Sequence, residues 1–292
     1  VQYTLPANHE LTMVFTFHHL KVDYANGEKW TKAPFDFMKL KQILNDWQIG
    51  MAKGGGWNAL FWNNHDQPRA LNRFGDPVHY RAKSAEMLAT TMHLLRGTPY
   101  IYMGEEIGMS DPDYTSMADY VDIECKNAYK ELLAAGKSAT EAFEIVKTKS
   151  RDNSRTPMQW DNSEYAGFST HKPWLMPTNQ AEVNVKDELV TGEVFAYYQK
   201  LIKLRKTQPI ISLGDFKPLL ENDPQVFAYL RDYKGQTLVV LNNFYGKSTT
   251  VQLPDSLANR SGKILISNYP EQTTVGPKIE LKPYQSTALL LN

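Results

Sequence analysis

The sequence has 292 residues, 42% of them hydrophobic, which is enough for one large folded domain or two smaller ones. Its 32 basic and 32 acidic side chains cancel, and no basic tract interleaves with aromatic residues, which argues against nucleic acid or an anionic membrane as a partner. The single cysteine, Cys125, excludes an internal disulfide, and no apolar run reaches the length of a membrane span. We therefore expect a cytoplasmic protein with a small neutral or polar ligand.

The region up to Pro209 predicts βα units around a parallel sheet, because apolar runs alternate there with segments of helical periodicity. Strands are predicted at residues 13–17, 59–62 and 99–102. Helices are predicted at residues 37–47, 85–95 and 193–206. Residues 110–184 form a long excursion with one predicted helix at 138–146, since Ser138 and Glu141 have the spacing of a capping box.

From Ile210 onward the pattern changes to short alternating strands, predicted at residues 226–233, 237–241, 249–253, 264–266 and 286–291. This pattern is typical of a small antiparallel β-sandwich. The predicted fold class is therefore α/β followed by all-β, with one domain at residues 1–209 and a second at 210–292.

The most specific stretch for function is residues 61–69, which read Phe-Trp-Asn-Asn-His-Asp-Gln-Pro-Arg. It places His65 and Asp66 after an apolar strand, at the end where parallel barrels have their active sites. An arbitrary His-Asp pair at such a position is more often a loop cap. The whole stretch, however, resembles the fourth signature region of the α-amylase superfamily. This resemblance implies that Asp66 is a catalytic residue that stabilises the transition state, and that His65 binds the same sugar.

Three further stretches resemble the oligo-1,6-glucosidase group of that superfamily, which is glycoside hydrolase family 13. They are residues 17–24 with the following Lys29 and Trp30, residues 97–106, and residues 150–160. The first resembles trehalose-6-phosphate hydrolases most. The resemblance therefore implies a retaining α-glucosidase that cleaves trehalose 6-phosphate into glucose and glucose 6-phosphate. An oligo-1,6-glucosidase or dextran glucosidase remains the alternative.

The same resemblance assigns candidate substrate-binding residues. Arg151, which we favour over Arg155, is expected to reach the non-reducing glucose, although an interdomain salt bridge is the alternative. Glu124 is expected beside the leaving sugar, with an ordinary helix N-terminal carboxylate as the alternative. Lys29 and Lys21 are candidates for binding a 6-phosphate, because phosphate needs cationic or amide donors. No metal ligand set and no cofactor are predicted.

Glu105 and Glu106 follow the third predicted strand and suggest a catalytic pair at first sight. Adjacent residues on a strand point to opposite faces, so two such carboxylates do not flank one glycosidic bond. We therefore predict a structural or outer role for both.

The resemblance places the nucleophilic Asp and the acid/base Glu at the ends of the fourth and fifth barrel strands, and neither signature occurs in this sequence. A (β/α)8 TIM barrel has eight strands, whereas three are predicted here. We therefore expect the C-terminal part of such a barrel, strands six to eight, which is inactive unless the missing N-terminal portion accompanies it. A function of another class, a non-catalytic sugar-binding or assembly module, is also compatible with these residues.

Overall fold

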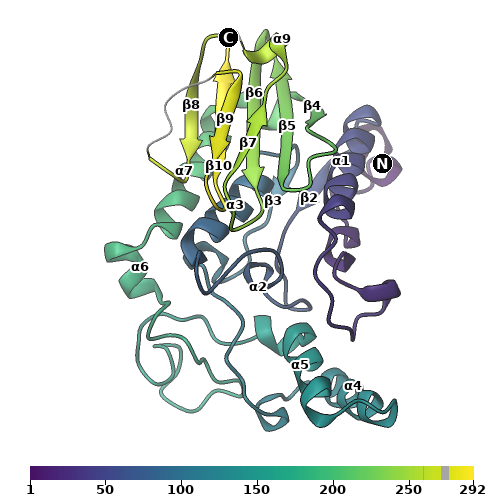
Figure 1. Cartoon of the computed structure of the whole chain (residues 1–292), viewed down its shortest axis with the longest axis vertical. Helices are drawn as coiled ribbons and strands as arrows, with labels where there is room; N and C mark the ends of the chain where they lie inside the picture. The colour runs from purple at the N-terminus through teal and green to yellow at the C-terminus, as the bar shows by residue number, and fades with distance from the viewer. Residues whose placement is uncertain (259, 271–275) are drawn as a thin grey trace.

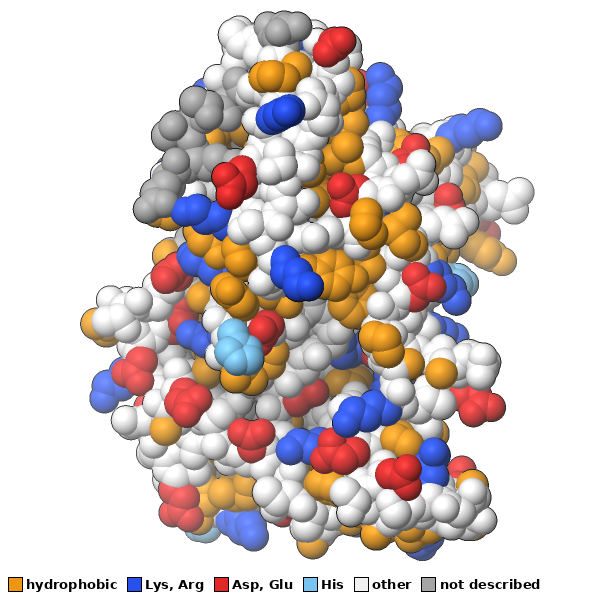
Figure 2. All heavy atoms as spheres, viewed as in Figure 1, with side chains coloured by type: hydrophobic (Ala, Val, Ile, Leu, Met, Phe, Trp, Pro, Cys, Tyr) orange, Lys and Arg blue, Asp and Glu red, His pale blue; other side chains and the backbone are white. Residues whose placement is uncertain are grey.

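The computed structural model describes residues 1–258, 260–270 and 276–292. Figure 1 shows the β-rich part of the chain at one end of the molecule and the helices α4 and α5 at the other. Figure 2 shows acidic and basic side chains interspersed over the same face, in agreement with the balanced net charge. No helix in the described part of the chain is long and apolar enough to cross a membrane.

The predicted parallel sheet is present, with the order β1 (Val14–Phe15), β2 (Asn58–Leu60) and β3 (Thr98–Pro99). Val14 lies opposite Asn58, and Ala59 lies opposite Thr98. The strands are shorter than predicted, because β1 and β3 each pair only with β2 among the described residues. One further bond, from Tyr100 N to Leu60 O at 2.7 Å, continues the β2–β3 pairing beyond the strand ends.

Strand β1 and the segments that follow β1 and β3 carry aromatic side chains that are almost half exposed. Phe15 is 45% exposed, Phe17 47% and Tyr100 45%. The rings of Phe15 and Phe17 both pack edge-on against buried Phe61, at centroid distances of 5.3 and 5.4 Å. Closing a parallel sheet into a barrel covers strand edges and apolar faces of this kind.

The predicted helices that cover the sheet are present as α1 (Phe37–Lys53), α3 (Arg81–His93) and α7 (Val194–Thr207). The short helices α2 (Ala70–Phe74) and α8 (Pro209–Leu213) accompany them. α1 buries Phe37, Leu40 and Leu44 on one face, as their spacing predicts. Its first turn is capped by Asp36, whose carboxylate accepts a bond of 2.9 Å from Lys39 N.

The excursion contains α4 (Ile123–Ala134), α5 (Ala139–Lys149) and α6 (Val185–Thr191). The capping box of Ser138 and Glu141 at the start of α5 is confirmed. α4 was not predicted, because the residues that it buries, Cys125 and Ala128, are small and give no strong apolar stripe. The 3₁₀ turns are η1 (Gln2–Thr4), η2 (Pro6–Asn8), η3 (His18–Lys21), η4 (Ala25–Gly27), η5 (Glu105–Ile107), η6 (Met117–Asp119) and η7 (Arg151–Ser154).

The predicted β-sandwich is also present. One antiparallel sheet has the strand order β4-β5-β6-β10-β8, and β7 pairs with β9 in a second. The bounds are β4 Asp215–Leu219, β5 Val226–Tyr233, β6 Gln236–Asn243, β7 Thr249–Gln252, β8 Gly262–Ser267, β9 Lys278–Leu281 and β10 Ser286–Leu291, with the short helix α9 at Asp255–Ala258. β4 and β9 were not predicted. β4 contains Pro218, and β9 has only two apolar residues, both buried.

One hydrophobic core joins the α/β part to the larger sheet of the sandwich. It runs from Leu40 on α1 and Leu88 on α3 through Leu201 on α7 to Tyr229 and Val240. A second core lies between the two sheets of the sandwich. The two parts therefore share buried surface instead of being separated by a linker.

Buried cations add hydrogen bonds to this junction. Lys41 on α1 is 2% exposed, and its ammonium donates to the carbonyls of Leu220, Asp223 and Val226 at 2.7, 2.7 and 2.9 Å. Arg231 on β5 is fully buried and donates to the carbonyls of Leu94, Ile211 and Gly214. Each cation satisfies carbonyls that would otherwise be buried without a donor.

We predict that Lys41→Met lowers the free energy of unfolding by about 2–4 kcal/mol, because it leaves three carbonyls without their donor. Urea unfolding followed by circular dichroism measures the loss. Lys39→Met, at an exposed position on the same helix, is the matched control and is expected to change stability by less than about 0.5 kcal/mol. Equal losses in the two variants would contradict a special role for Lys41.

Candidate active site

The loop after β2 carries the central candidate residues and is held at both ends. Phe61 and Trp62 continue the strand direction and are buried, and Trp62 Nε1 donates to Leu88 O on α3 at 2.8 Å. The side chain of Asn63 then accepts from Ala70 N at 2.6 Å and donates to Glu105 Oε2 at 2.5 Å. The loop between Asn63 and Ala70 is therefore closed by one amide group.

His65 and Asp66 lie at the tip of this loop with half-open side chains. His65 is 70% exposed and Asp66 44%, and His65 Nε2 lies 3.3 Å from Asp66 Oδ2. Asp66 N donates to Asn64 Oδ1 at 2.9 Å, which fixes the backbone below the carboxylate. Both side chains are thus accessible to a ligand on the side of the sheet where β2 ends.

Two arginines from η7 and its end face Asp66. Arg155 Nη2 donates to Asp66 Oδ1 at 2.9 Å, and Arg155 Nε donates to the carbonyl of His65 at 2.6 Å. Arg151 Nη1 lies 3.7 Å from the same carboxylate oxygen. Arg155 is therefore the nearer of the two to Asp66, although the sequence favoured Arg151 as the sugar-binding arginine.

Arg151 also forms a bidentate pair with Asp122. Its Nε and Nη2 atoms donate to the two carboxylate oxygens at 2.6 and 2.8 Å. This pair lowers the pKa of Asp122 and raises that of Arg151. The contact is possible because the carboxylate of Asp152 accepts from the backbone amides of Val121 and Asp122, at 2.8 and 3.0 Å, and so joins η7 to the start of α4.

Glu124 extends the same row of charges. One oxygen lies 3.0 Å from Arg151 Nε, and the other lies 2.8 Å from Lys29 Nζ. The Lys29 ammonium is also 4.7 Å from the centre of the Trp30 ring, which is a cation–π contact. Glu124 is in the first turn of α4, so it has both the position of a helix N-terminal carboxylate and contacts within the site.

The structure therefore brings together Asp66, His65, Arg151, Glu124 and Lys29. Lys21 is exposed at the end of η3, and none of the ion pairs in the described part of the chain includes it. Two residues in contact with this group were not chosen as site residues from the sequence: Asp122 and the less favoured Arg155. Asp122 precedes a helix and its acidic type suits an N-cap, but no sequence signal pairs it with Arg151.

Glu105 and Glu106 follow the third strand as expected, but they lie in a turn and not in the extended backbone that alternating faces require. Gly104 adopts a φ of 85°, which ends the extended segment, and both glutamates begin the 3₁₀ turn η5. Glu105 accepts from Asn63 and also from Tyr198 Oη on α7, at 2.9 Å. It contacts the residue that closes the loop and not Asp66, so the predicted outer role agrees with its contacts.

No group of three or more histidine, cysteine, aspartate or glutamate side chains within residues 1–258, 260–270 and 276–292 has the arrangement of a metal site. What the loop region offers a ligand is a carboxylate, an imidazole and a row of alternating charges. Carboxylates, guanidinium groups and indole rings are the groups that bind sugar hydroxyls, phosphates and sugar rings.

The chain has part of a parallel barrel, with loops at the carboxyl ends of its strands, followed by a β-sandwich. Comparison with known families identifies the class of protein that has this combination. Residues 1–214 match the family model "Alpha amylase, catalytic domain", and residues 226–287 match "Alpha-amylase SusG C-terminal domain". The chain belongs to the alpha-amylase family. The predicted domain boundary at residue 209 lies close to the end of the first match and stays a prediction.

Individual relatives are more specific. The chain is 50% identical over 290 residues to a trehalose-6-phosphate hydrolase of Bacillus subtilis (strain 168), covering 98% of this chain and 52% of that protein. It is 44% identical over 291 residues to an oligo-1,6-glucosidase of Halalkalibacterium halodurans, covering 99% and 52%. A solved structure of trehalose-6-phosphate hydrolase from Bacillus licheniformis superposes with a TM-score of 0.96 at 51% identity, covering 99% and 53%. The chain spans about half the length of these relatives.

Burial raises the pKa of the Glu105 carboxyl to about 7. The folded state then keeps a proton that the unfolded chain releases near its ordinary value of 4.5, so this carboxyl's contribution to stability falls as pH rises from about 5 to 7. Burial lowers the pKa values of His19 and His93 from 6.5 to about 4. Their contribution to stability therefore rises as pH rises from about 4 to 6.5, opposite to that of Glu105. Substitution at residue 105 is therefore needed to isolate the carboxyl.

We predict that the melting temperature of the wild-type chain minus that of Glu105→Gln is smaller at about pH 7 than at about pH 5. Glutamine does not titrate, so the difference reports the Glu105 carboxyl alone. Calorimetry at the two pH values measures this difference. Glu144→Gln, at a half-exposed position on α5, is the control and is expected to give the same difference at both pH values. A Glu105→Gln difference that does not change with pH would contradict the prediction.

Proposed function

We propose that this chain forms the sugar-binding part of the active site of a retaining α-glucosidase, and that its substrate is trehalose 6-phosphate. The observation that carries the proposal is the contact of Asp66 with two arginines at the carboxyl end of β2, beside His65. The similarity to relatives named trehalose-6-phosphate hydrolase supports the choice of substrate. The products are then glucose and glucose 6-phosphate, with net retention.

Asp66 acts in this proposal as the transition-state stabiliser. Retaining hydrolysis needs a nucleophilic and an acid/base carboxylate, and hydrogen bonds to sugar hydroxyls that strengthen in the transition state add several kcal/mol. The half-open Asp66 carboxylate is oriented by Arg155, and so it can accept such hydroxyl bonds without a change in position. His65 and Arg151 bind the same glucose.

The leaving sugar lies on the side of Glu124 and Lys29. The two side chains pair with each other at 2.8 Å, and Lys29 is held against Trp30. A 6-phosphate near Lys29 would place a dianion next to an ammonium, while Glu124 accepts from a sugar hydroxyl. Lys21 is exposed on the same loop and is the second phosphate ligand in this proposal.

The nucleophile and the acid/base belong to residues outside this sequence. The three parallel strands correspond to strands six to eight of the barrel, in residues 1–209, with the sandwich at 210–292. The half-exposed aromatic side chains of β1 and of the segment after β3 support this proposal, because they would face the remaining barrel strands. The activity then belongs to the assembly of this chain with the N-terminal portion.

We predict that Asp66→Asn, in the complete enzyme, lowers kcat on trehalose 6-phosphate about a thousandfold, because ~4 kcal/mol of transition-state stabilisation is lost. The Michaelis constant is expected to change much less. Steady-state hydrolysis measures both. Asp161→Asn is the control, because the Asp161 carboxylate accepts from Ser163 N in a loop of its own. A similar fall in the kcat of this variant would argue against a specific role of Asp66.

We predict that Lys29→Ala and Lys21→Ala each raise the KM for trehalose 6-phosphate about tenfold or more and leave that for isomaltose nearly unchanged. A lost charge-assisted bond to phosphate is worth ~1.5–3 kcal/mol, and isomaltose has no phosphate. Lys32→Ala, whose exposed side chain pairs with Glu144, is the matched control. Unchanged KM values in both variants would overturn the phosphate assignment.

The assay that tests the proposed function combines the intact mass of the sample with hydrolysis of the two substrates. Faster hydrolysis of trehalose 6-phosphate by the assembled barrel supports the proposal. Faster hydrolysis of isomaltose instead identifies an oligo-1,6-glucosidase. Hydrolysis of neither by the assembled barrel leaves a non-catalytic sugar-binding module as the function.

A further inference from the structure

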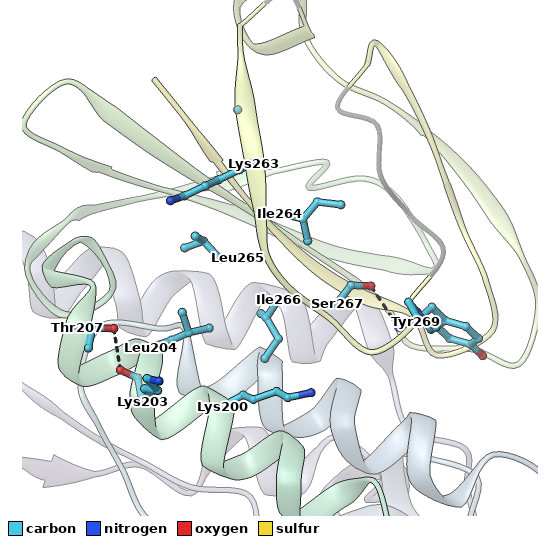
Figure 3. Close-up of a pocket in the computed structure, with 12 residues that line it drawn as sticks. Lys200, Lys203, Leu204, Thr207, Lys263, Ile264, Leu265, Ile266, Ser267 and Tyr269 are labelled. Carbon is cyan, nitrogen blue, oxygen red and sulfur yellow. Dashed lines mark hydrogen bonds between the residues drawn. The ribbon is translucent and has the colours of Figure 1, made fainter.

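A groove of about 720 Å³ lies between α7 and the strand β8, at the junction of the α/β part and the sandwich. Figure 3 shows its two walls, with Leu204 on the helix facing Leu265 and Ile266 on the strand. None of the residues that line it belongs to the candidate active site, which is formed by the loops after β2 and around η7. The groove is therefore a separate surface feature.

An irregularity in β8 gives the groove its apolar floor. The pairing of β8 with β10 shifts between Ala288 and Leu289, so Leu265 is an extra residue with no direct partner on β10. As a result Leu265 and Ile266 both pack on the side of the helices, whereas Ile264 packs into the core between the two sheets. Together with Leu204, the two side chains make an apolar strip in which Leu204 and Leu265 are partly accessible and Ile266 is buried.

Three lysines surround this strip. Lys200 and Lys203 come from α7 and Lys263 comes from β8, and all three are exposed. Among residues 1–258, 260–270 and 276–292, the lining of the groove includes no aspartate or glutamate, and none of the three lysines forms an ion pair. The neighbouring acids Glu86 and Glu193 both pair with Lys83 instead. Lys200 also interacts electrostatically with Glu86, so it is partly compensated, whereas no described acidic side chain forms an ion pair with Lys203 or Lys263. The groove is therefore lined by more positive than negative charge.

The three ammonium groups are spread along the groove and do not converge on one point. In Figure 3, Lys200 extends along α7 away from Lys203, and Lys263 extends from the opposite wall. A single compact anion such as phosphate is bound by donors that converge on it. Separated cations beside an apolar strip match an extended chain that carries several spaced carboxylates and an apolar side chain between them.

We propose that this groove docks an extended acidic peptide segment of another protein, with its carboxylates on Lys200, Lys203 and Lys263 and an apolar side chain over Leu204 and Leu265. Recognition is by side chains and not by addition of a full strand to the sheet. β8 is the last strand of its sheet in the described residues, but its bulge and the lysine at its edge disfavour regular strand pairing.

The test uses a fluorescein-labelled peptide of aspartates and glutamates with one central leucine, and fluorescence anisotropy with this chain. The triple variant Lys200→Glu, Lys203→Glu, Lys263→Glu is expected to weaken binding tenfold or more, since each exposed ion pair contributes a factor of about 1.5 to 5. Lys206→Glu, exposed on the same helix but outside the groove, is the matched control and is expected to change the affinity less than twofold. Circular dichroism checks that each variant stays folded.

A second peptide, with serine in place of the leucine, separates docking from general charge attraction. The proposal expects it to bind at least threefold more weakly, because it leaves the apolar strip uncovered. Equal binding of the two peptides, or equal loss with Lys206→Glu, would overturn the proposal. Competition by inorganic phosphate at the concentration of the peptide would also overturn it, because that result identifies a compact anion site. A dimer that only the triple variant abolishes would overturn it as well, because a second copy of the chain is then the occupant.

Discussion

The arrangement of this chain depends on buried cations that donate to backbone carbonyls where the α/β part meets the sandwich. Lys41 and Arg231 each donate to three backbone carbonyls distant in sequence. Half-buried Arg205 on α7 donates to the carbonyls of His93 and Leu95 and so holds α7 against the end of α3. α7 also contacts β8 of the large sheet. From α7, Tyr198 reaches Glu105, and Glu105 in turn holds Asn63, which closes the loop of Asp66. A series of hydrogen bonds thus connects α7 to the loop of Asp66, while Arg231 of the sandwich donates to Leu94, between the two carbonyls that Arg205 binds.

Charges in the site follow one another with alternating sign. Lys29, Glu124, Arg151 and Asp122 form one row, and Arg155 with Asp66 lies beside it. Each carboxylate is held in place by a cation before any ligand arrives, so its position requires little reorganisation. These six side chains are three cations and three carboxylates, and basic and acidic residues are also equal in number in the whole sequence.

The sequence allowed much of this to be predicted where local patterns dominate. α5 was recognisable from Ser138 and Glu141, and β5 and β10 were located at their observed bounds because apolar and aromatic residues dominate them. α4 was missed because Cys125 and Ala128 give too weak a stripe. The turn that contains Glu105 was not predicted, because nothing local shows that Gly104 takes a positive φ. The pair of Arg151 and Asp122 depends on amides that Asp152 binds at long range, and such tertiary contacts leave no local signal.

The hydrogen bonds of Lys41 also bear on modular exchange between proteins of this architecture. A boundary drawn near residue 209 divides the sequence, but the carbonyls of residues 220–226 receive their donor from α1, far on the other side of that boundary. A sandwich transferred to a different barrel would keep its own strands and lose this donor. Chimeras of such enzymes therefore need to carry the matching helix surface, with Lys41 and the segments around Leu94, together with the sandwich.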